Sequence, residues 1–242
     1  LPFTAPHTPW APLKEFQGRA TALSYGDFVS QVDDSVGRIL KTLEERGLKE
    51  NTLVVFTSDN GPYWKPQDID STGHRSAAGW RGMKADIYDA GHRIPFIARW
   101  PGHIRPGGVS SQIGCLTDLT ATAAELAGIS LPRDAAEDSF SLVPALARSK
   151  PATPVRDSVI HHSSQGMFAI RKGPWKLNLG RGSGGFTPPV TFTPGPGEPP
   201  AELYNLASDP AETRNLWADQ PAVVKELTAL LDRYQREGRS RP

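Results

Sequence analysis

Hydrophobic side chains recur at helical spacing over one long stretch near the start of the chain. From about Ala20 to Arg46, apolar residues repeat at steps of three and four positions, and Gly47 then supplies a stop signal. The apolar stripe consists of Tyr25, Phe28, Val29, Val32, Val36, Ile39, Leu40 and Leu43. The spacing predicts an amphipathic helix, with Asp33 and Asp34 on its solvent-exposed side.

Two short apolar runs further along the chain have the pattern of buried strands. Leu53–Phe56 is a continuous run rich in β-branched residues, which is typical of a strand buried on both faces of a parallel sheet. A second core strand is predicted over Ile94–Trp100, and a helix over Thr117–Leu126 that ends before Gly128. Helix followed by strand is the order expected of an α/β layer. The long polar stretch over residues 63–93 predicts a loop.

The pattern changes after Pro151. Short strands separated by turn residues are predicted at Val159–His161, Met167–Ile170, Trp175–Leu179 and Leu203–Leu206. Residues 182–200, rich in Gly, Pro and Thr, predict an irregular loop. Apolar residues between Val223 and Tyr234 predict a closing helix that packs on the small sheet. We therefore expect two domains, an α/β core over residues 1–150 and a small α+β subdomain with an antiparallel sheet over residues 151–242.

Composition excludes several classes of protein. The chain has 242 residues, enough to bury a substantial core, and its formal net charge of +1 gives no reason to expect nucleic acid or an anionic membrane as partner. No apolar run approaches the length of a membrane span. The single cysteine, Cys115, excludes an internal disulfide and a cysteine-only metal site. Its apolar neighbours predict a buried, unreactive side chain.

The first candidate for chemistry is the turn that follows the Leu53–Phe56 strand. Ligand sites in open α/β sheets lie just beyond the carboxyl ends of the strands, which is where Asp59 and Asn60 stand. Carboxylate and amide oxygens are ligands suited to Ca²⁺ or Mg²⁺. The alternative is that Asp-Asn-Gly forms a simple turn, since all three residue types favour turns.

Five separated stretches resemble the formylglycine-dependent sulfatases, in the order in which that family has them. They are Ala5–Pro12 ("APHxPxxP"), Thr57–Gly61 ("TSDNG"), Gly82–Lys84 with Asp89–Pro95 ("GxK…EGGxRVP", with Asp-Ala replacing Glu-Gly), Gly166–Leu177 and Glu202–Leu216. The resemblance implies a mostly parallel, alkaline-phosphatase-like sheet with flanking helices and a small C-terminal subdomain. It also implies hydrolysis of sulfate esters.

The resemblance assigns roles to individual residues. Asp59 and Asn60 would be Ca²⁺ ligands, with Mg²⁺ as an alternative ion, while Lys84 and His7 would contact the sulfate and form the catalytic pair of this chain. A sulfate ester needs cationic donors aimed at oxygens that gain charge as the S–O bond breaks. The candidates for the rest of the substrate-binding site are His74, Arg75 and His161. His92 and Arg93 are expected to hold their loop in place.

The "C/S-x-P-x-R" stretch that yields the family's formylglycine nucleophile is absent from this sequence. We therefore expect this chain to be the C-terminal part of a sulfatase. By itself, the chain is expected to be catalytically inactive and to bind calcium weakly or not at all. Its expected partners are a sulfated small molecule or glycan and either the missing N-terminal part or a second copy, docked on an exposed apolar face. The parent protein is expected in the periplasm or outside the cell. Two alternatives stay open, namely a phosphonate or phosphodiester hydrolase of the same superfamily and a catalytically silent module that binds sulfated glycans.

Overall fold

The computed structural model describes residues 1–147 and 153–242, which divide into two compact units. Unit 1 contains Leu1–Val54, Trp64–Ser76 and Arg99–Gly102, and unit 2 contains Val55–Tyr63, Ala77–Ala98 and the described part of His103–Pro242. The domain boundary predicted between residues 150 and 151 lies outside the described residues, so it stays a prediction. None of the described helices is long and apolar enough to cross a membrane.

Unit 1 is organised around the long helix α1, Leu23–Glu45, which confirms the predicted amphipathic helix. The buried Asp27 carboxylate fixes the chain before this helix, because it accepts hydrogen bonds from three backbone N–H groups of the preceding loop at 2.8, 2.9 and 2.9 Å. The other helices of unit 1 are the short 3-10 helices η1 (Lys14–Phe16) and η2 (Lys49–Asn51) and the helix α2 (Pro66–Thr72). Helix α2 lies inside the stretch predicted as loop. It begins at a proline and ends at Gly73, whose φ of +70° suits glycine.

Strands β1, Val54–Thr57, and β2, Phe96–Arg99, pair in a two-stranded sheet close to the predicted positions. Every residue of β1 is half-buried, and the side chains of Phe96 and Ile97 are 39% and 62% exposed. The predicted burial of the first strand on both faces is therefore wrong for this chain, because its sheet has two strands within the described residues. The exposed apolar side chains of β2 agree with the expectation of an uncovered sheet face.

Helix α3 (Asp89–His92) lies between β1 and β2 in the sequence. Helices α4 (Asp118–Leu126) and α5 (Val143–Ala147) follow β2. Helix α4 confirms its prediction, whereas α3 lies in the predicted loop. The predicted burial of Cys115, just before α4, is wrong, whereas its lack of reactivity stays a prediction. Its side chain is half-buried and its sulfur accepts a hydrogen bond from Arg156 at 2.9 Å, because Arg156 is held there by a buried ion pair of 2.8 Å with Asp118.

The predicted small sheet is present and antiparallel. Its four strands, in the order β3-β4-β5-β6, are Ser158–His162, Phe168–Lys172, Trp175–Asn178 and Glu202–Asn205. The pairing places Ile160, Ile170, Leu177 and Leu203 side by side across the sheet. Since alternate residues of a strand face opposite sides, these four side chains lie on one face.

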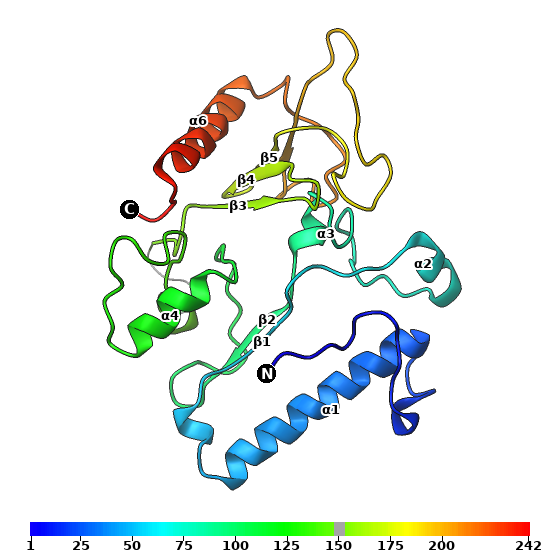
Figure 1. The fold of residues 1–242 in the computed structure, drawn as a ribbon, viewed down its shortest axis with the longest axis vertical. Coiled ribbons are helices and arrows are strands. Elements are labelled where there is room, and N and C mark those ends of the chain that lie inside the picture. The colour runs from blue at the N-terminus through cyan, green and yellow to red at the C-terminus, as the bar shows by residue number, and fades with distance from the viewer. Residues whose placement is uncertain (148–152) are drawn as a thin grey trace. The chain divides into compact units, whose positions relative to one another are not determined.

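The two faces of this sheet have different partners. Helix α6, Pro221–Glu237, lies beside this sheet (Figure 1). The isoleucine and leucine face packs against α6 through Leu227 and Leu231. Each of these leucines is almost completely buried, which stabilises the subdomain by about 1.5–3 kcal/mol per side chain. The opposite face packs against Ile87 and Tyr88, from the segment around α3. The predicted packing of the closing helix on the sheet is confirmed.

Candidate functional site

The turn after β1 carries the predicted metal ligands. The Asp59 carboxylate is exposed and the Asn60 side chain is half-buried. The Asn60 Nδ2 donates a hydrogen bond to the Gly61 carbonyl at 2.8 Å, which leaves its Oδ1 available to a cation. The Ser58 hydroxyl donates to the Asn60 carbonyl at 3.2 Å. These local bonds fix the turn that carries Asp59 and Asn60.

The backbone of this turn is bonded to the segment that carries Lys84. The Lys84 N–H donates to the Pro62 carbonyl at 2.8 Å, and the Gly61 N–H donates to the Gly91 carbonyl at 3.0 Å. A Cβ on Gly61 would lie 1.7 Å from the Ala90 carbonyl oxygen, so this close approach requires glycine. The structure thus brings Lys84 beside the turn that holds Asp59 and Asn60, although a long stretch of loop and helix separates them in the sequence.

The buried carboxylate of Asp86 fixes the conformation of the segment around Lys84. Asp86 is 0% exposed, and its Oδ2 accepts a hydrogen bond from the Met83 N–H at 2.9 Å. Its Oδ1 accepts from the Phe186 and Thr187 N–H groups at 2.7 and 3.0 Å. Sequence reasoning missed Asp86, because a single aspartate in a polar stretch carries no spacing signal that separates a buried carboxylate from a solvated one.

A buried ion pair supports the same segment from the face of the small sheet that packs against Ile87 and Tyr88. The Lys176 Nζ lies 2.8 Å from the Glu212 Oε1 and donates to the Ile87 carbonyl at 2.8 Å. The Glu212 Oε2 accepts from the Asp89 N–H at 2.6 Å. Both side chains are 0% exposed. Burial lowers the pKa of Lys176 and raises the pKa of Glu212, while their mutual attraction opposes both shifts.

Charged residues around α3 also hold the segment that carries Lys84. The Arg93 Nε donates to the Asp89 Oδ2 at 2.6 Å, and the Arg93 guanidinium lies 4.3 Å from the centre of the Trp80 ring. The Arg171 NH1 lies 3.8 Å from the other oxygen of Asp89. These contacts agree with the expectation that Arg93 holds its loop in place.

The predicted substrate residue His161 lies against His92, with ring centres 4.1 Å apart. Burial, followed by repulsion from Lys176, lowers the pKa of His92 to about 4 and lowers the pKa of His161 well below its ordinary value. Both imidazoles are therefore neutral at pH 7. Among the described residues, the Nε2 atoms of both rings are buried without a hydrogen-bond partner. A substrate contact of His161 stays a prediction.

The remaining predicted site residues, His7, His74 and Arg75, belong to unit 1. His7 is exposed, and its Nδ1 lies 2.6 Å from the Thr8 carbonyl oxygen. His74 packs edge-on against Trp64, with ring centres 5.5 Å apart, and its carbonyl accepts a hydrogen bond from the Trp64 Nε1. Lys84 belongs to unit 2, so the convergence of these residues with Lys84 stays a prediction.

The donor set of this chain fits part of a calcium site. Over the described ranges, no three His, Cys, Asp or Glu side chains gather closely enough to hold a metal ion. Asp59 and Asn60 supply two neighbouring oxygen ligands, whereas Ca²⁺ takes six to eight. The chemistry of the two side chains suits calcium, and further ligands are needed to complete the shell.

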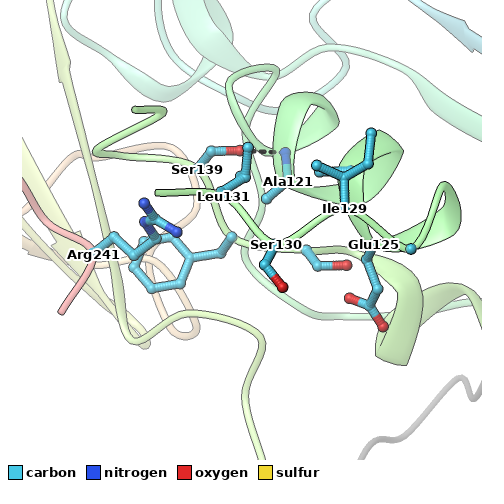
Figure 2. Close-up of a pocket in the computed structure, with 11 residues that line it drawn as sticks. Ala121, Glu125, Ile129, Ser130, Leu131, Ser139 and Arg241 are labelled. Atoms are coloured by element: carbon cyan, nitrogen blue, oxygen red, sulfur yellow. Dashed lines mark hydrogen bonds between the residues drawn. The ribbon is translucent and has the colours of Figure 1, made fainter. Parts of the chain in front are cut away.

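A surface pocket of about 500 Å³ lies at the carboxyl end of α4 (Figure 2). Its lining consists of apolar residues and serines, with Glu125 and Arg241 as its charged members. None of the predicted site residues lines this pocket, so we assign it no part in the candidate site.

The comparison with known families decides the identity of the family. The sequence model of the family described as Sulfatase matches residues 1–129, which is more than half of the chain. The chain belongs to the sulfatase family. The "APHxPxxP", "TSDNG" and "GxK" stretches all lie inside the matched region.

Two curated sulfatases illustrate how far the similarity extends. An N-acetylgalactosamine-6-O-sulfatase of Bacteroides thetaiotaomicron is 35% identical over 234 residues, which cover 93% of this chain and 44% of that protein. Human arylsulfatase A is 32% identical over 246 residues, covering 95% of this chain and 46% of that protein. The chain therefore spans less than half the length of these relatives.

Solved structures of sulfatases share the fold. A structure described in connection with glycosaminoglycan metabolism by Bacteroides thetaiotaomicron has a TM-score of 0.84 and 32% identity, covering 96% of this chain and 48% of that one. A sulfatase from Pseudoalteromonas sp. has a TM-score of 0.76 and 27% identity, covering 95% of this chain and 46% of that one. The predicted alkaline-phosphatase-like α/β fold is confirmed by this likeness.

Proposed function

We propose that this chain supplies part of the calcium and sulfate site of a sulfatase that hydrolyses sulfate esters of carbohydrates. The observation that supports it most directly is the hydrogen bond of 2.8 Å from the Lys84 N–H to the Pro62 carbonyl. This bond keeps an ammonium-bearing residue beside the turn that carries Asp59 and Asn60. In the proposed site, the Asp59 carboxylate binds the cation and the Lys84 ammonium binds the sulfate, and the backbone bond supports a common location for the two residues.

Each residue has a distinct task in this proposal. The Lys84 ammonium, a compact point charge, holds the sulfate oxygens and stabilises the charge that grows on them as the S–O bond breaks. His7 donates a further hydrogen bond to these oxygens. Asp59 and Asn60 would hold calcium, which polarises and orients the sulfate when bound, and the formylglycine expected outside this chain supplies the nucleophile. His74, Arg75 and His161 are the candidates for contacts with the rest of the substrate.

The proposed substrate class is a sulfated sugar. One relative that covers most of this chain is an N-acetylgalactosamine-6-O-sulfatase. A solved structure that is 26% identical, with a TM-score of 0.63, holds D-glucosamine-2-N,6-O-disulfate as its substrate. The sugar in the name of that relative and the sugar in that solved structure are both amino sugars that carry sulfate. N-acetylgalactosamine 6-sulfate is therefore a suitable first substrate for the assay.

A catalytically silent glycan-binding module is the second candidate for the chain by itself. In that case Lys84 and the Asp59–Asn60 turn bind a sulfated glycan, and no ester is cleaved.

The test compares Lys84→Ala with Lys225→Ala, an exposed lysine of α6, in the intact protein. Loss of one charged donor at a developing negative charge lowers kcat/KM by about 10² to 10³-fold, so Lys84→Ala should lose that much activity on the sulfated sugar. Lys225→Ala should match the parent. Parent-level activity in Lys84→Ala would refute the proposed site.

The same assay separates the rival functions. Faster hydrolysis of phosphonate or phosphate diesters than of sulfate esters would indicate a phosphonate or phosphodiester hydrolase. Binding of the sulfated sugar without hydrolysis of any ester would indicate the silent module.

A further inference from the structure

The long loop between β5 and β6 forms a defined bend close to Lys84. Residues 182–200 contain no helix or strand, as predicted. The Ser183 N–H donates to the Pro189 carbonyl at 2.9 Å, and the Gly184 N–H donates to the Val190 carbonyl at 2.8 Å. These two bonds close a bend whose tip contains Gly185, Phe186 and Thr187. We refer to residues 183–190 as the aromatic bend.

The tip of the aromatic bend is fixed to the segment that carries Lys84. The N–H groups of Phe186 and Thr187 both donate to the buried Asp86 carboxylate, and the Thr187 hydroxyl donates to the same carboxylate. A Cβ on Gly185 would lie 2.4 Å from the Ala85 carbonyl oxygen, so the two backbones are in direct contact. The bend therefore cannot move away from Lys84 without breaking charge-assisted hydrogen bonds.

The Phe186 ring is exposed although its backbone is fixed. Its side chain is 50% exposed, and the ring packs edge-to-face against Tyr63, with centres 5.7 Å apart and planes at 80°. Tyr63 directly follows Pro62, whose carbonyl accepts the Lys84 N–H. An aromatic pair with one exposed ring thus lies on the two segments that meet at Lys84.

We propose that Phe186, supported by Tyr63, is a specificity-determining residue that stacks on the sugar ring of a substrate whose sulfate lies at Lys84. This inference rests on the proposed function and identifies the part of the site that recognises the carrier of the sulfate. Aromatic rings gain free energy from apolar surface laid against their faces, and a sugar ring offers such a surface on its C–H side. The ring is already ordered, so stacking costs little conformational entropy.

The test uses Phe186→Ala in the intact protein, with Phe192→Ala as the matched control. Phe192 lies on the same loop and is 40% exposed, but its ring packs 3.9 Å from the Arg181 guanidinium. For N-acetylgalactosamine 6-sulfate, Phe186→Ala should raise KM about five- to tenfold, in line with the loss of one aromatic contact. Inhibition by inorganic sulfate, which has no ring, should not change. Phe186→Tyr should restore the parent KM, and Phe192→Ala should match the parent.

Two results would overturn the inference. One is an unchanged KM for the sulfated sugar in Phe186→Ala. The other is an equal weakening of inhibition by inorganic sulfate, which would mean that the substitution displaced the Lys84 segment instead of removing a ring contact. If the parent protein hydrolyses no sulfate ester, the proposed function fails. Calorimetric binding of the same sugar then decides about Phe186, since weaker binding by Phe186→Ala supports stacking and equal binding refutes it.

Discussion

The buried pair of Lys176 and Glu212 offers a sharp test of how the segment around Lys84 is held. Replacing Lys176 by Met leaves the Glu212 carboxylate 0% exposed and without its cation. Breaking a buried ion pair by removing one partner destabilises a protein by about 3–5 kcal/mol. The Ile87 carbonyl also loses its donor, which costs about 1–3 kcal/mol.

The double variant Lys176→Met/Glu212→Gln separates these two effects. It retains the loss at the Ile87 carbonyl but leaves no unpaired charge at position 212, and the amide oxygen introduced by Glu212→Gln can still accept the hydrogen bond from the Asp89 N–H. We therefore expect the double variant to be about 2–4 kcal/mol more stable than the single variant at pH 8. The free energies of unfolding come from urea denaturation of each variant, followed by circular dichroism.

The pH dependence of this difference has a definite sign. Burial raises the pKa of Glu212 above its ordinary value of 4.5, and removing the lysine withdraws the attraction that opposed this shift. In the single variant the folded state binds more protons than the unfolded state, so its stability rises as the pH falls through the folded pKa. The gap between single and double variants should narrow from pH 8 to pH 5. Equal stabilities at pH 8, or a gap that widens on acidification, would refute the buried ion pair.

Three further predictions concern other parts of the chain. Gly61→Ala should destabilise the protein by about 3 kcal/mol in urea denaturation, because its Cβ would overlap a backbone carbonyl oxygen. The control Gly37→Ala, whose Cβ would meet no atom within 4 Å, should not destabilise it. Equal stabilities of the two variants would contradict the close approach at Gly61. The pKa of His92 is lowered from 6.5 to about 4. The free energy of unfolding of the parent should therefore fall by roughly 3 kcal/mol more than that of His92→Asn between pH 7 and pH 4. Parallel curves of melting temperature against pH for the two proteins would refute this. Calorimetric titration of the isolated chain with calcium should show weak or no binding, and tight binding that survives Asp59→Ala would remove this carboxylate from the site.

Local patterns predicted most helices and strands of this chain. The apolar period of three and four residues identified α1 and α6, and short apolar runs between turn residues identified the four strands of the small sheet. Helices α2, α3 and α5 escaped prediction because they are short, so none of them presents an extended apolar stripe. The half-buried state of β1 was not predicted either, because the burial of a strand depends on neighbouring strands that the local sequence does not specify.

The candidate site divides in the same way. Asp59, Asn60 and Lys84 could be named from short motifs, because their residue types carry the chemistry. Asp86 and the Lys176–Glu212 pair could not be named from the sequence. The partners of Asp86 lie about a hundred positions away, and only the tertiary structure buries Asp86, Lys176 and Glu212. The sequence therefore offers candidates for contact with a substrate but does not reveal the residues that hold their segment in place.

The long separation between Asp89 and Glu212 has a consequence for biosynthesis. The two residues are 123 positions apart, and Glu212 accepts the Asp89 N–H. At ribosomal rates of about 5–20 residues per second, the acidic partner leaves the peptidyl-transferase centre roughly 6–25 seconds after Asp89 does. During that interval the Asp89 N–H lacks the carboxylate that accepts it in the folded chain. Release of a prematurely terminated chain ending before Glu212 would leave a polypeptide that contains Lys84 and the Asp59–Asn60 turn but lacks the carboxylate that accepts the Asp89 N–H.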